Sequence, residues 1–246
     1  MHTNLTYVAV MLGIMVFQKA HAHTFLSNIA VGDTEEPVGK YIQKYLGYKL
    51  FPVNDVTTKN MRCRNAEGID PKAATFPVKA GTEFSVVWHH YNNSITDNMV
   101  SPSHRGPCTI YMAQQKPNPD DNQWFKIYEL GFDKTANLWC SDILRNAHGR
   151  LNFTLPMDIV DGNYLLRTEL IALHKAAFFN GTQFYPNCVQ LSISGSKNKF
   201  LDPPPHYVSF PGAYGPEDKG ILYDVKQDKG QNYVIPGPEV YPPVTK

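Results

Sequence analysis

Charged residues are scarce in this chain. They make up 18% of its 246 residues, against about a quarter in an average soluble protein. The 23 Lys and Arg residues nearly balance the 22 Asp and Glu residues, so the net charge is +1. Without a basic excess to neutralise phosphates, a nucleic-acid partner is not expected. Hydrophobic residues reach 42% and aromatic residues 12%, enough apolar side chain for a folded core.

Long hydrophobic runs are also missing beyond the N-terminus, so no membrane-spanning helix is expected there. The one apolar stretch, Leu5–Phe17, is too short to cross a membrane comfortably. It is followed by the sequence AHA at residues 20–22, the small-x-small pattern of a signal-peptidase site. We expect residues 1–22 to be a signal peptide and the secreted chain to begin at His23.

Cysteine is limited to four residues, none of them in a CxxC pair, which argues against a zinc ribbon or a thioredoxin-like motif. An even number in a secreted protein favours two disulfides, and three pairings of Cys63, Cys108, Cys140 and Cys188 are possible. Three sequons fit the secretory route and predict glycosylation sites in surface loops, at Asn92, Asn152 and Asn180.

Helical periodicity is nearly absent, apart from a possible short turn at Ser141–Asn146. Short β-branched or alternating runs recur between Gly and Pro residues, which is typical of an antiparallel β-sandwich or barrel. The predicted strands are Glu83–Trp88, Thr109–Met112, Phe125–Tyr128, Leu151–Leu155, Tyr164–Leu173 and Val189–Ser194.

No internal repeat and no Ser/Thr-rich linker interrupts the chain. We therefore expect a single domain over residues 23–246, without a carbohydrate-binding module. The segment Asp202–Lys246 holds nine of the 19 prolines, yet it also carries apolar and aromatic runs that favour burial. We expect it to wrap the domain as ordered loops.

Hydrolytic signatures are lacking: there is no recognisable carboxylate pair, GxSxG elbow or Cys–His arrangement. The histidines are better candidates for a functional site. His23 would carry two nitrogen donors after cleavage, its α-amine and its ring, and a third from a distant histidine would complete a tetragonal set suited to copper(II). His104, in the tight loop SPSHRGP, is a candidate. The simpler alternatives are that His23 merely follows the cleavage site and that His104 bonds to backbone in a turn.

Further polar residues follow towards the C-terminal end. Gln183 and Tyr185 are two apart, so on a strand they share a face, and His174 on the preceding strand could lie beside them. The alternative is a polar cluster satisfied within the core. The adjacent His89 and His90 point to opposite faces of a strand, which disfavours joint chelation and favours a structural or surface role.

In this order, a cleaved N-terminal His23, the loop SHRGP, the strand YLLRTELIALH and the segment QFYPNC resemble the fungal lytic polysaccharide monooxygenases of auxiliary activity family nine, formerly glycoside hydrolase family sixty-one. The later segments VSFPGAY and YVIPGP extend the similarity to about residue 238. The resemblance implies an immunoglobulin-like antiparallel β-sandwich with long loops and little helix.

The resemblance also implies a histidine brace holding one copper ion. His23 would bind through its amine and ring Nδ1, His104 through Nε2, and Tyr185 axially through its phenol oxygen. His174 and Gln183 would hydrogen-bond the oxygen species, as groups around a metal commonly do. The family pattern pairs Cys63 with Cys188, which leaves Cys108 for Cys140.

The implied activity is oxidation at C1 or C4 of a β-1,4-glucan such as cellulose, or a hemicellulose, by a secreted monomer. The reaction would use O2 or H2O2 and electrons from a small reductant or a partner enzyme. Aromatic rings would stack on the sugars, by position Tyr241 and less directly Tyr41, Tyr45 or Tyr48. Two alternatives remain open: a non-catalytic carbohydrate-binding protein and a copper-carrying secreted protein.

Overall fold

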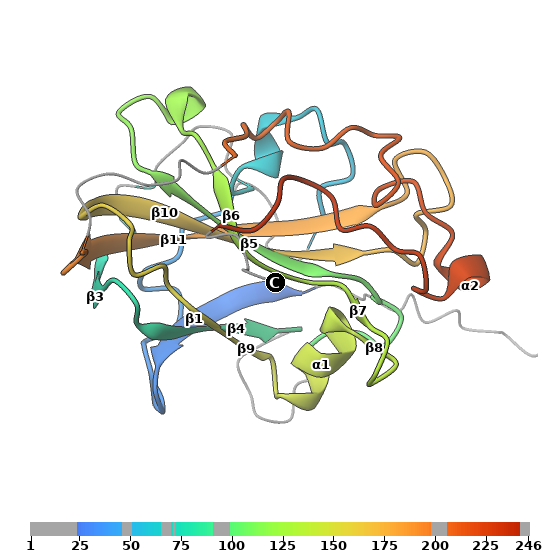
Figure 1. The fold of residues 1–246 in the computed structure, drawn as a ribbon, viewed down its shortest axis with the longest axis horizontal. Coiled ribbons are helices and arrows are strands. Elements are labelled where there is room, and N and C mark those ends of the chain that lie inside the picture. The colour runs from blue at the N-terminus through green and yellow to red at the C-terminus, as the bar shows by residue number, and fades with distance from the viewer. Residues whose placement is uncertain are drawn as a thin grey trace, which may run out of the picture.

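Two β-sheets face each other in the computed structural model, which describes residues 24–45, 51–64, 70, 72–90, 99–197 and 206–241 (Figure 1). The four-stranded sheet has the order β2-β1-β4-β9 and the five-stranded sheet the order β3-β11-β10-β5-β6. The first sheet comprises β1 (Phe25–Val31), β2 (Thr34–Glu35), β4 (Glu83–His89) and β9 (Arg150–Thr154). The second comprises β3 (Phe76–Lys79), β5 (Cys108–Gln114), β6 (Phe125–Leu130), β10 (Gly162–Ala172) and β11 (Gln183–Ser194).

Helix is limited to short pieces in the described part of the chain. These are the 3-10 turns η1 (Lys59–Met61) and η2 (Pro119–Asp121) and the helices α1 (Cys140–Asn146) and α2 (Val225–Asp228). A small hairpin of β7 (Phe132–Asp133) and β8 (Leu138–Trp139) precedes α1. No helix of the described residues is long and apolar enough to cross a membrane. The predicted β-sandwich with little helix is confirmed.

Each predicted strand overlaps an observed one, although Leu155 and Leu173 fall one residue beyond β9 and β10, and the possible turn at residues 141–146 lies in α1. Within the two main sheets the pairing is antiparallel except between β3 and β11, which run parallel. Five strands were not predicted from the sequence, namely β1, β2, β3, β7 and β8. Six of the seven β1 residues are buried, so polar and apolar side chains do not alternate along it as they do in a half-exposed strand.

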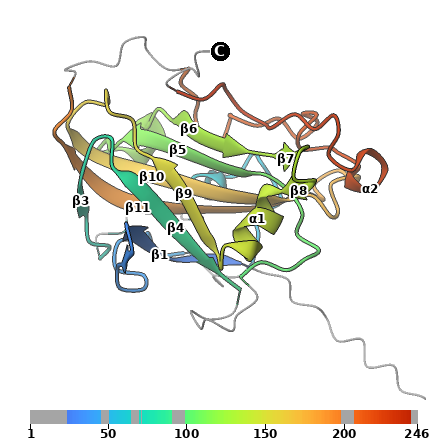
Figure 2. The same cartoon turned by 60° about the horizontal axis from the view of Figure 1, so that its bottom comes forward.

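Apolar side chains fill two regions. The inner core lies between the sheets and includes Phe84, Val86, Ile110, Leu166 and Val189. The outer layer lies on the other side of the five-stranded sheet and includes Tyr111, Trp124, Phe184, Phe210 and Tyr214. Residues 206–241 run over that outer side (Figure 2). The expectation that the C-terminal segment forms ordered loops against the domain is confirmed for these residues.

One disulfide belongs to each region. Cys108–Cys140 lies in the inner core, and Cys63–Cys188 ties the loop after η1 to β11 in the outer layer. Both pairings are those that the family resemblance implies.

Candidate metal site at one end of the sandwich

The candidate site lies where three strands meet at one end of the five-stranded sheet. Strand β10 runs antiparallel to both β5 and β11, so its final residues lie beside the first residues of those two strands. His104 precedes β5, His174 follows β10, and Gln183 begins β11. The topology therefore brings these distant residues together.

The side chains of the four residues are in contact. The Nε2 atom of His104 lies 3.1 Å from the hydroxyl oxygen of Tyr185, and that hydroxyl donates a hydrogen bond of 2.9 Å to Oε1 of Gln183. The rings of His104 and His174 stack with their centroids 4.4 Å apart. His104 is 2% exposed and Tyr185 is fully buried. The cluster thus joins an imidazole, a phenol and an amide in a confined space.

Local packing fixes the direction of the His104 ring. The backbone N–H of His104 donates to the carbonyl of Ser101, and Ser103 Oγ lies 3.1 Å from Nδ1. Gly106 allows the loop to pass against β10, because a Cβ there would stand 1.8 Å from the carbonyl oxygen of Ile171. With Nδ1 engaged by Ser103, Nε2 is the nitrogen that faces Tyr185.

The segment between His174 and Gln183 is a tightly hydrogen-bonded loop. Its N–H groups donate to nearby carbonyls at Ala176 to Leu173, Phe178 to Lys175 and Gly181 to Phe178, over 2.9 to 3.1 Å. Within the described part of the chain, the buried Nδ1 of His174 has no hydrogen-bond partner. Burial, with a smaller contribution from the charge of Lys175, lowers the pKa of His174. Desolvation thus disfavours the charged imidazolium form of this ring.

Arg64 connects the start of the described chain to the cluster. Its guanidinium lies 5.1 Å from the ring centroid of Tyr185 and 5.3 Å from that of Tyr45, and Nη2 donates a weak 3.4 Å hydrogen bond to the carbonyl of Thr24. Burial raises the pKa of the Tyr185 phenol, and the nearby Arg64 acts against that rise. Sequence reasoning missed Arg64, because one arginine in an irregular loop gives no pattern to find.

The residues present fit a copper ion. Imidazole nitrogen is a donor that copper favours, and His104 offers one beside the phenol oxygen of Tyr185. Among the described residues no group of three His, Cys, Asp or Glu could hold a metal. His23, the further ligand predicted from the sequence, lies outside the described residues together with the predicted signal peptide. Thr24, the next residue, reaches the cluster through Arg64.

Two predicted sugar-stacking residues are buried, and that prediction is wrong for both. The ring of Tyr241 packs edge-on against Phe125 at 5.6 Å, and its exposure is 2%. Tyr41 packs edge-on against Phe76 at 5.0 Å and is 8% exposed. Neither ring presents a face to a sugar. The hydroxyl of Tyr45 donates to the carbonyl of Leu26, while Tyr48 lies outside the described residues.

Exposed aromatic rings occur elsewhere, on the loop between His174 and Gln183. Phe178 is 74% exposed and Phe179 is 63% exposed. Large apolar side chains held in water by an ordered loop commonly mark a contact surface. The sequence signal was the pair FF beside an Asn-Gly turn, which sequence analysis did not single out.

The other predicted positions are less connected to the cluster. Asn180 is exposed at a φ of 54°, and Asn152 is exposed on β9, where its side chain accepts a 2.7 Å hydrogen bond from Ser85. Asn92 lies outside the described residues. His89 and His90 are buried at the end of β4, with the His89 ring 6.4 Å from that of Phe25. A structural role suits the histidine pair.

Comparison with known proteins agrees with this geometry. The family model described as Auxiliary Activity family 9 (formerly GH61) matches residues 23–233. The AA9 family lytic polysaccharide monooxygenase A of Aspergillus niger is 37% identical over 224 residues, which cover 90% of this chain and 53% of that protein. The chain thus spans about half the length of such relatives.

Solved structures give the same result. The structure named CvAA9A superposes with a TM-score of 0.79 at 28% identity, covering 89% of this chain and 98% of that one. The crystal structure of HiLPMO9B gives a TM-score of 0.71 at 26% identity, covering 89% and 99%. Fold, order of site residues and family model agree, and the chain belongs to Auxiliary Activity family 9.

Proposed function

We propose that this chain is a secreted, copper-dependent lytic polysaccharide monooxygenase that cleaves β-1,4-glucan at C1, C4 or both. The observation that carries the proposal is the buried contact between His104 Nε2 and the Tyr185 hydroxyl, with His174 and Gln183 beside it. A copper carrier or a sugar-binding domain has no need for this surrounding layer of imidazole and amide.

The protein's residues divide into ligands and groups that position them. His104 would bind copper through Nε2, Tyr185 through its phenol oxygen, and His23 through its amine and ring. When bound, copper supplies the redox chemistry that activates O2 or H2O2 with electrons from an external reductant. Ser103 and the stacked ring of His174 hold the His104 ring in place. His174 and Gln183 would orient the oxygen co-substrate by hydrogen bonds.

The overall reaction balances without an acid–base pair. With O2, two electrons and two protons, one C–H bond of the sugar becomes C–OH and one water is released; with H2O2, one C–H bond becomes C–OH and one water is released. A hydroxyl at C1 or C4 makes the glycosidic bond eliminate, which separates the chain. The absence of a paired-carboxylate signature in the sequence is consistent with this chemistry.

Phe178 and Phe179 take the substrate role first assigned to tyrosines. Both rings are exposed on the loop that joins His174 to Gln183, so they belong to the same end of the sandwich as the site. The apolar face of a pyranose ring packs well on an aromatic ring. We expect the alanine variants of both residues to bind cellulose less tightly while keeping their copper.

Mass spectrometry of products from phosphoric-acid-swollen cellulose tests the proposal. The copper-loaded chain starting at His23 should release aldonic acids or C4-oxidised sugars only when ascorbate is present. His104→Ala should abolish both strong copper binding and oxidation. The matched control His206→Ala replaces an exposed histidine and should change neither. Copper binding without oxidised products from any β-glucan would overturn the proposal and favour a carbohydrate-binding or copper-carrying protein.

A further inference from the structure

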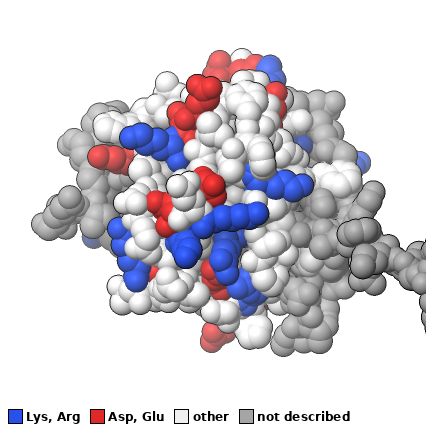
Figure 3. Space-filling view, turned by 90° about the vertical axis from the view of Figure 1, so that its right-hand side faces the viewer, with Lys and Arg blue, Asp and Glu red and all other residues white. Residues whose placement is uncertain are grey.

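A pocket opens beside the candidate metal site. It has a volume of about 320 Å³ and lies between the β7–β8 hairpin, α1 and α2, in the range where small-molecule pockets begin. Its walls include Arg105, Arg145 and Lys229, with Phe132 and Trp139 as the main aromatic residues. Figure 3 views this end of the molecule and shows Lys and Arg side chains gathered near the middle of the face.

The charges in the pocket do not cancel. Asp142 is the one carboxylate in the wall, and both of its oxygens are engaged, by Nη2 of Arg145 at 2.7 Å and by the backbone N–H of Trp139 at 3.1 Å. Among the described residues, the side chains of Arg105 and Lys229 form no ion pair or hydrogen bond. Two cations therefore face one small volume without a counter-charge, an arrangement that favours an anion.

Apart from Asn137, the rest of the wall is apolar. The ring of Phe132 lies 5.3 Å from that of the buried Trp139, and the partly exposed Phe132, Leu138 and Val225 offer the accessible apolar surface. A purely inorganic anion would gain nothing from these surfaces. A ligand that combines a carboxylate with the apolar face of a ring would use both, since an arginine fork matches a carboxylate and a pyranose face packs on apolar side chains.

The pocket and the metal site share a loop. Arg105 directly follows His104, and the N–H of Gly106 donates a 3.1 Å hydrogen bond to Ser141 in α1. A polysaccharide chain lying across His104 could therefore place a side group or an end group in the pocket.

We propose that this pocket binds the carboxylate of an acidic sugar. The choice of a sugar rests on the proposed function, while the choice of a carboxylate rests on Arg105, Arg145 and Lys229. Two sources supply that chemistry: the uronic acid side groups of hemicelluloses, and the aldonic acid ends that oxidation at C1 itself produces. In the first case the pocket selects substrate, and in the second it retains an oxidised chain end.

Isothermal titration calorimetry with the intact mature protein separates these cases. Cellobionic acid, a glucuronic-acid-bearing xylo-oligosaccharide and neutral cellobiose are titrated in turn at low and high salt. We expect one or both acids to bind more tightly than cellobiose, with an affinity that falls as salt rises. The acid that binds identifies the source.

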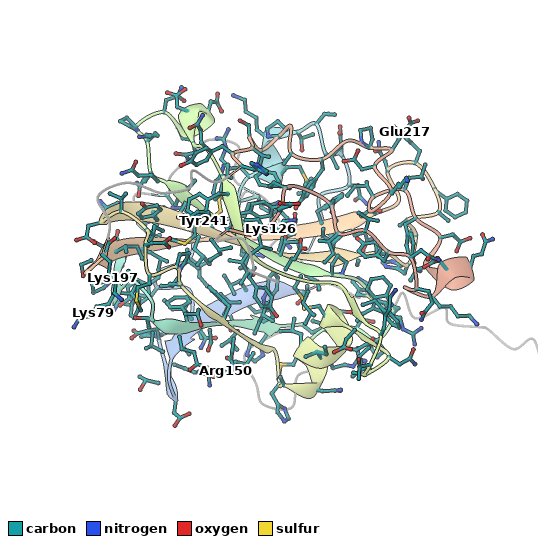
Figure 4. All side chains as sticks on the ribbon, viewed as in Figure 1. Lys79, Lys126, Arg150, Lys197, Glu217 and Tyr241 are labelled. Atoms are coloured by element: carbon teal, nitrogen blue, oxygen red, sulfur yellow. A yellow bond between two sulfur atoms is a disulfide. The ribbon has the colours of Figure 1, made fainter. Side chains whose placement is uncertain are left out.

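The double variant Arg105→Gln, Lys229→Gln should bind the acid about tenfold more weakly or worse, because charge-assisted hydrogen bonds are lost. The matched control Lys79→Gln, Lys197→Gln removes the same charge at a different end of the molecule (Figure 4) and should bind as the wild type does. Thermal unfolding checks that both variants fold.

Equal binding of acidic and neutral sugars, or an equal loss in the control variant, would overturn the proposal. The titration needs neither copper nor a reductant. If the protein oxidises cellulose but binds no acidic sugar, only the proposal for the pocket is refuted. If it binds acidic sugars but oxidises no polysaccharide, only the proposed monooxygenase activity is refuted.

Discussion

The two apolar regions on either side of the five-stranded sheet are built on different principles. The inner core is filled by alternate residues of regular strands, such as Val86, Ile110 and Leu166. The outer layer surrounds a fully buried ion pair, in which Nη1 of Arg167 lies 3.0 Å from Oε2 of Glu169. Strand pairing orders the backbone of the first region, whereas the second must order long loops.

The buried pair in the outer layer organises those loops. Nε and Nη2 of Arg167 donate to the carbonyl of Met61 at 3.0 and 2.9 Å, and the hydroxyl of Tyr214 donates to Oε2 of Glu169 at 2.8 Å. The guanidinium also lies 3.8 Å from the ring centroid of Phe210. One strand, β10, thus anchors both the end of η1 and the C-terminal segment. Loops without a hydrogen-bonded ladder need such polar anchors for their backbone groups.

Removing the disulfides should show the largest difference between the regions. The Cys63–Cys188 bond spans 125 residues and the Cys108–Cys140 bond spans 32. On the chain-entropy model, replacing each pair by alanine costs about 5 and about 4 kcal/mol respectively. Guanidinium unfolding measures both. The variant without Cys63–Cys188 should also bind copper more weakly, because this disulfide anchors β11. If it loses less free energy of unfolding than the variant without Cys108–Cys140, this ranking is contradicted.

Breaking the ion pair should come next. Glu169→Leu leaves the Arg167 guanidinium buried without its carboxylate, and we expect a loss of about 3 to 5 kcal/mol in the free energy of unfolding. Adding Arg167→Met to the same chain should restore part of that loss, since no unpaired charge remains. If the double variant is less stable than the single one, the pair contributes more than its own charge balance explains.

A smaller effect compares the packing of the two regions directly. Ile110 and Ile171 are both fully buried, one in the inner core and one in the outer layer. Changing each to valine should cost about 1 kcal/mol if the two regions are packed equally well. Urea denaturation measures both variants, and a negligible cost for Ile171→Val would reveal looser packing under the loops.

The smallest effect concerns one exposed carboxylate at the end of α2. Hydrogen bonds from the backbone N–H of Asn232, the hydroxyl of Tyr223 and the Asn232 side chain lower the pKa of Asp228 from 3.8 to about 2. Its stabilising contribution is therefore complete above pH 3.8 and is lost as the pH falls through 2. An NMR titration should find this low pKa in the wild type. The variant Asn232→Ala removes only the side-chain donor and should move the pKa upward, whereas an unchanged value would assign the shift to the backbone N–H of residue 232 and to Tyr223.

Local sequence composition explains how far the sequence could predict this molecule. Strands such as β5 and β10 carry apolar, β-branched or aromatic runs, and the order of His104, His174, Gln183 and Tyr185 along known motifs was enough to nominate residues that the structure places together. Where tertiary packing decides whether a side chain is buried or exposed, the local sequence does not predict the outcome. Nothing local distinguishes a tyrosine that stacks on sugar from one that fills a core, which is why Tyr241 was misassigned.

Irregular segments were the other limit. The exposure of Phe178, the contact of Arg64 with Tyr185 and the cationic pocket all depend on how loops fold against one another. Residues distant in the sequence meet there without any repeating spacing, so only coordinates can reveal them.

The C-terminal segment has a consequence for colloidal behaviour. Strand β6 ends the five-stranded sheet, yet its edge is engaged: Trp124, just before it, and Val208 exchange two backbone hydrogen bonds of 2.8 Å, and the N–H of Tyr241 donates to the carbonyl of Lys126 at 2.6 Å. Figure 4 shows Lys126 and Tyr241 close together. An open strand edge is a template on which another chain can add, the first step of aggregation. The C-terminal segment therefore hinders the addition of another chain along the edge of β6.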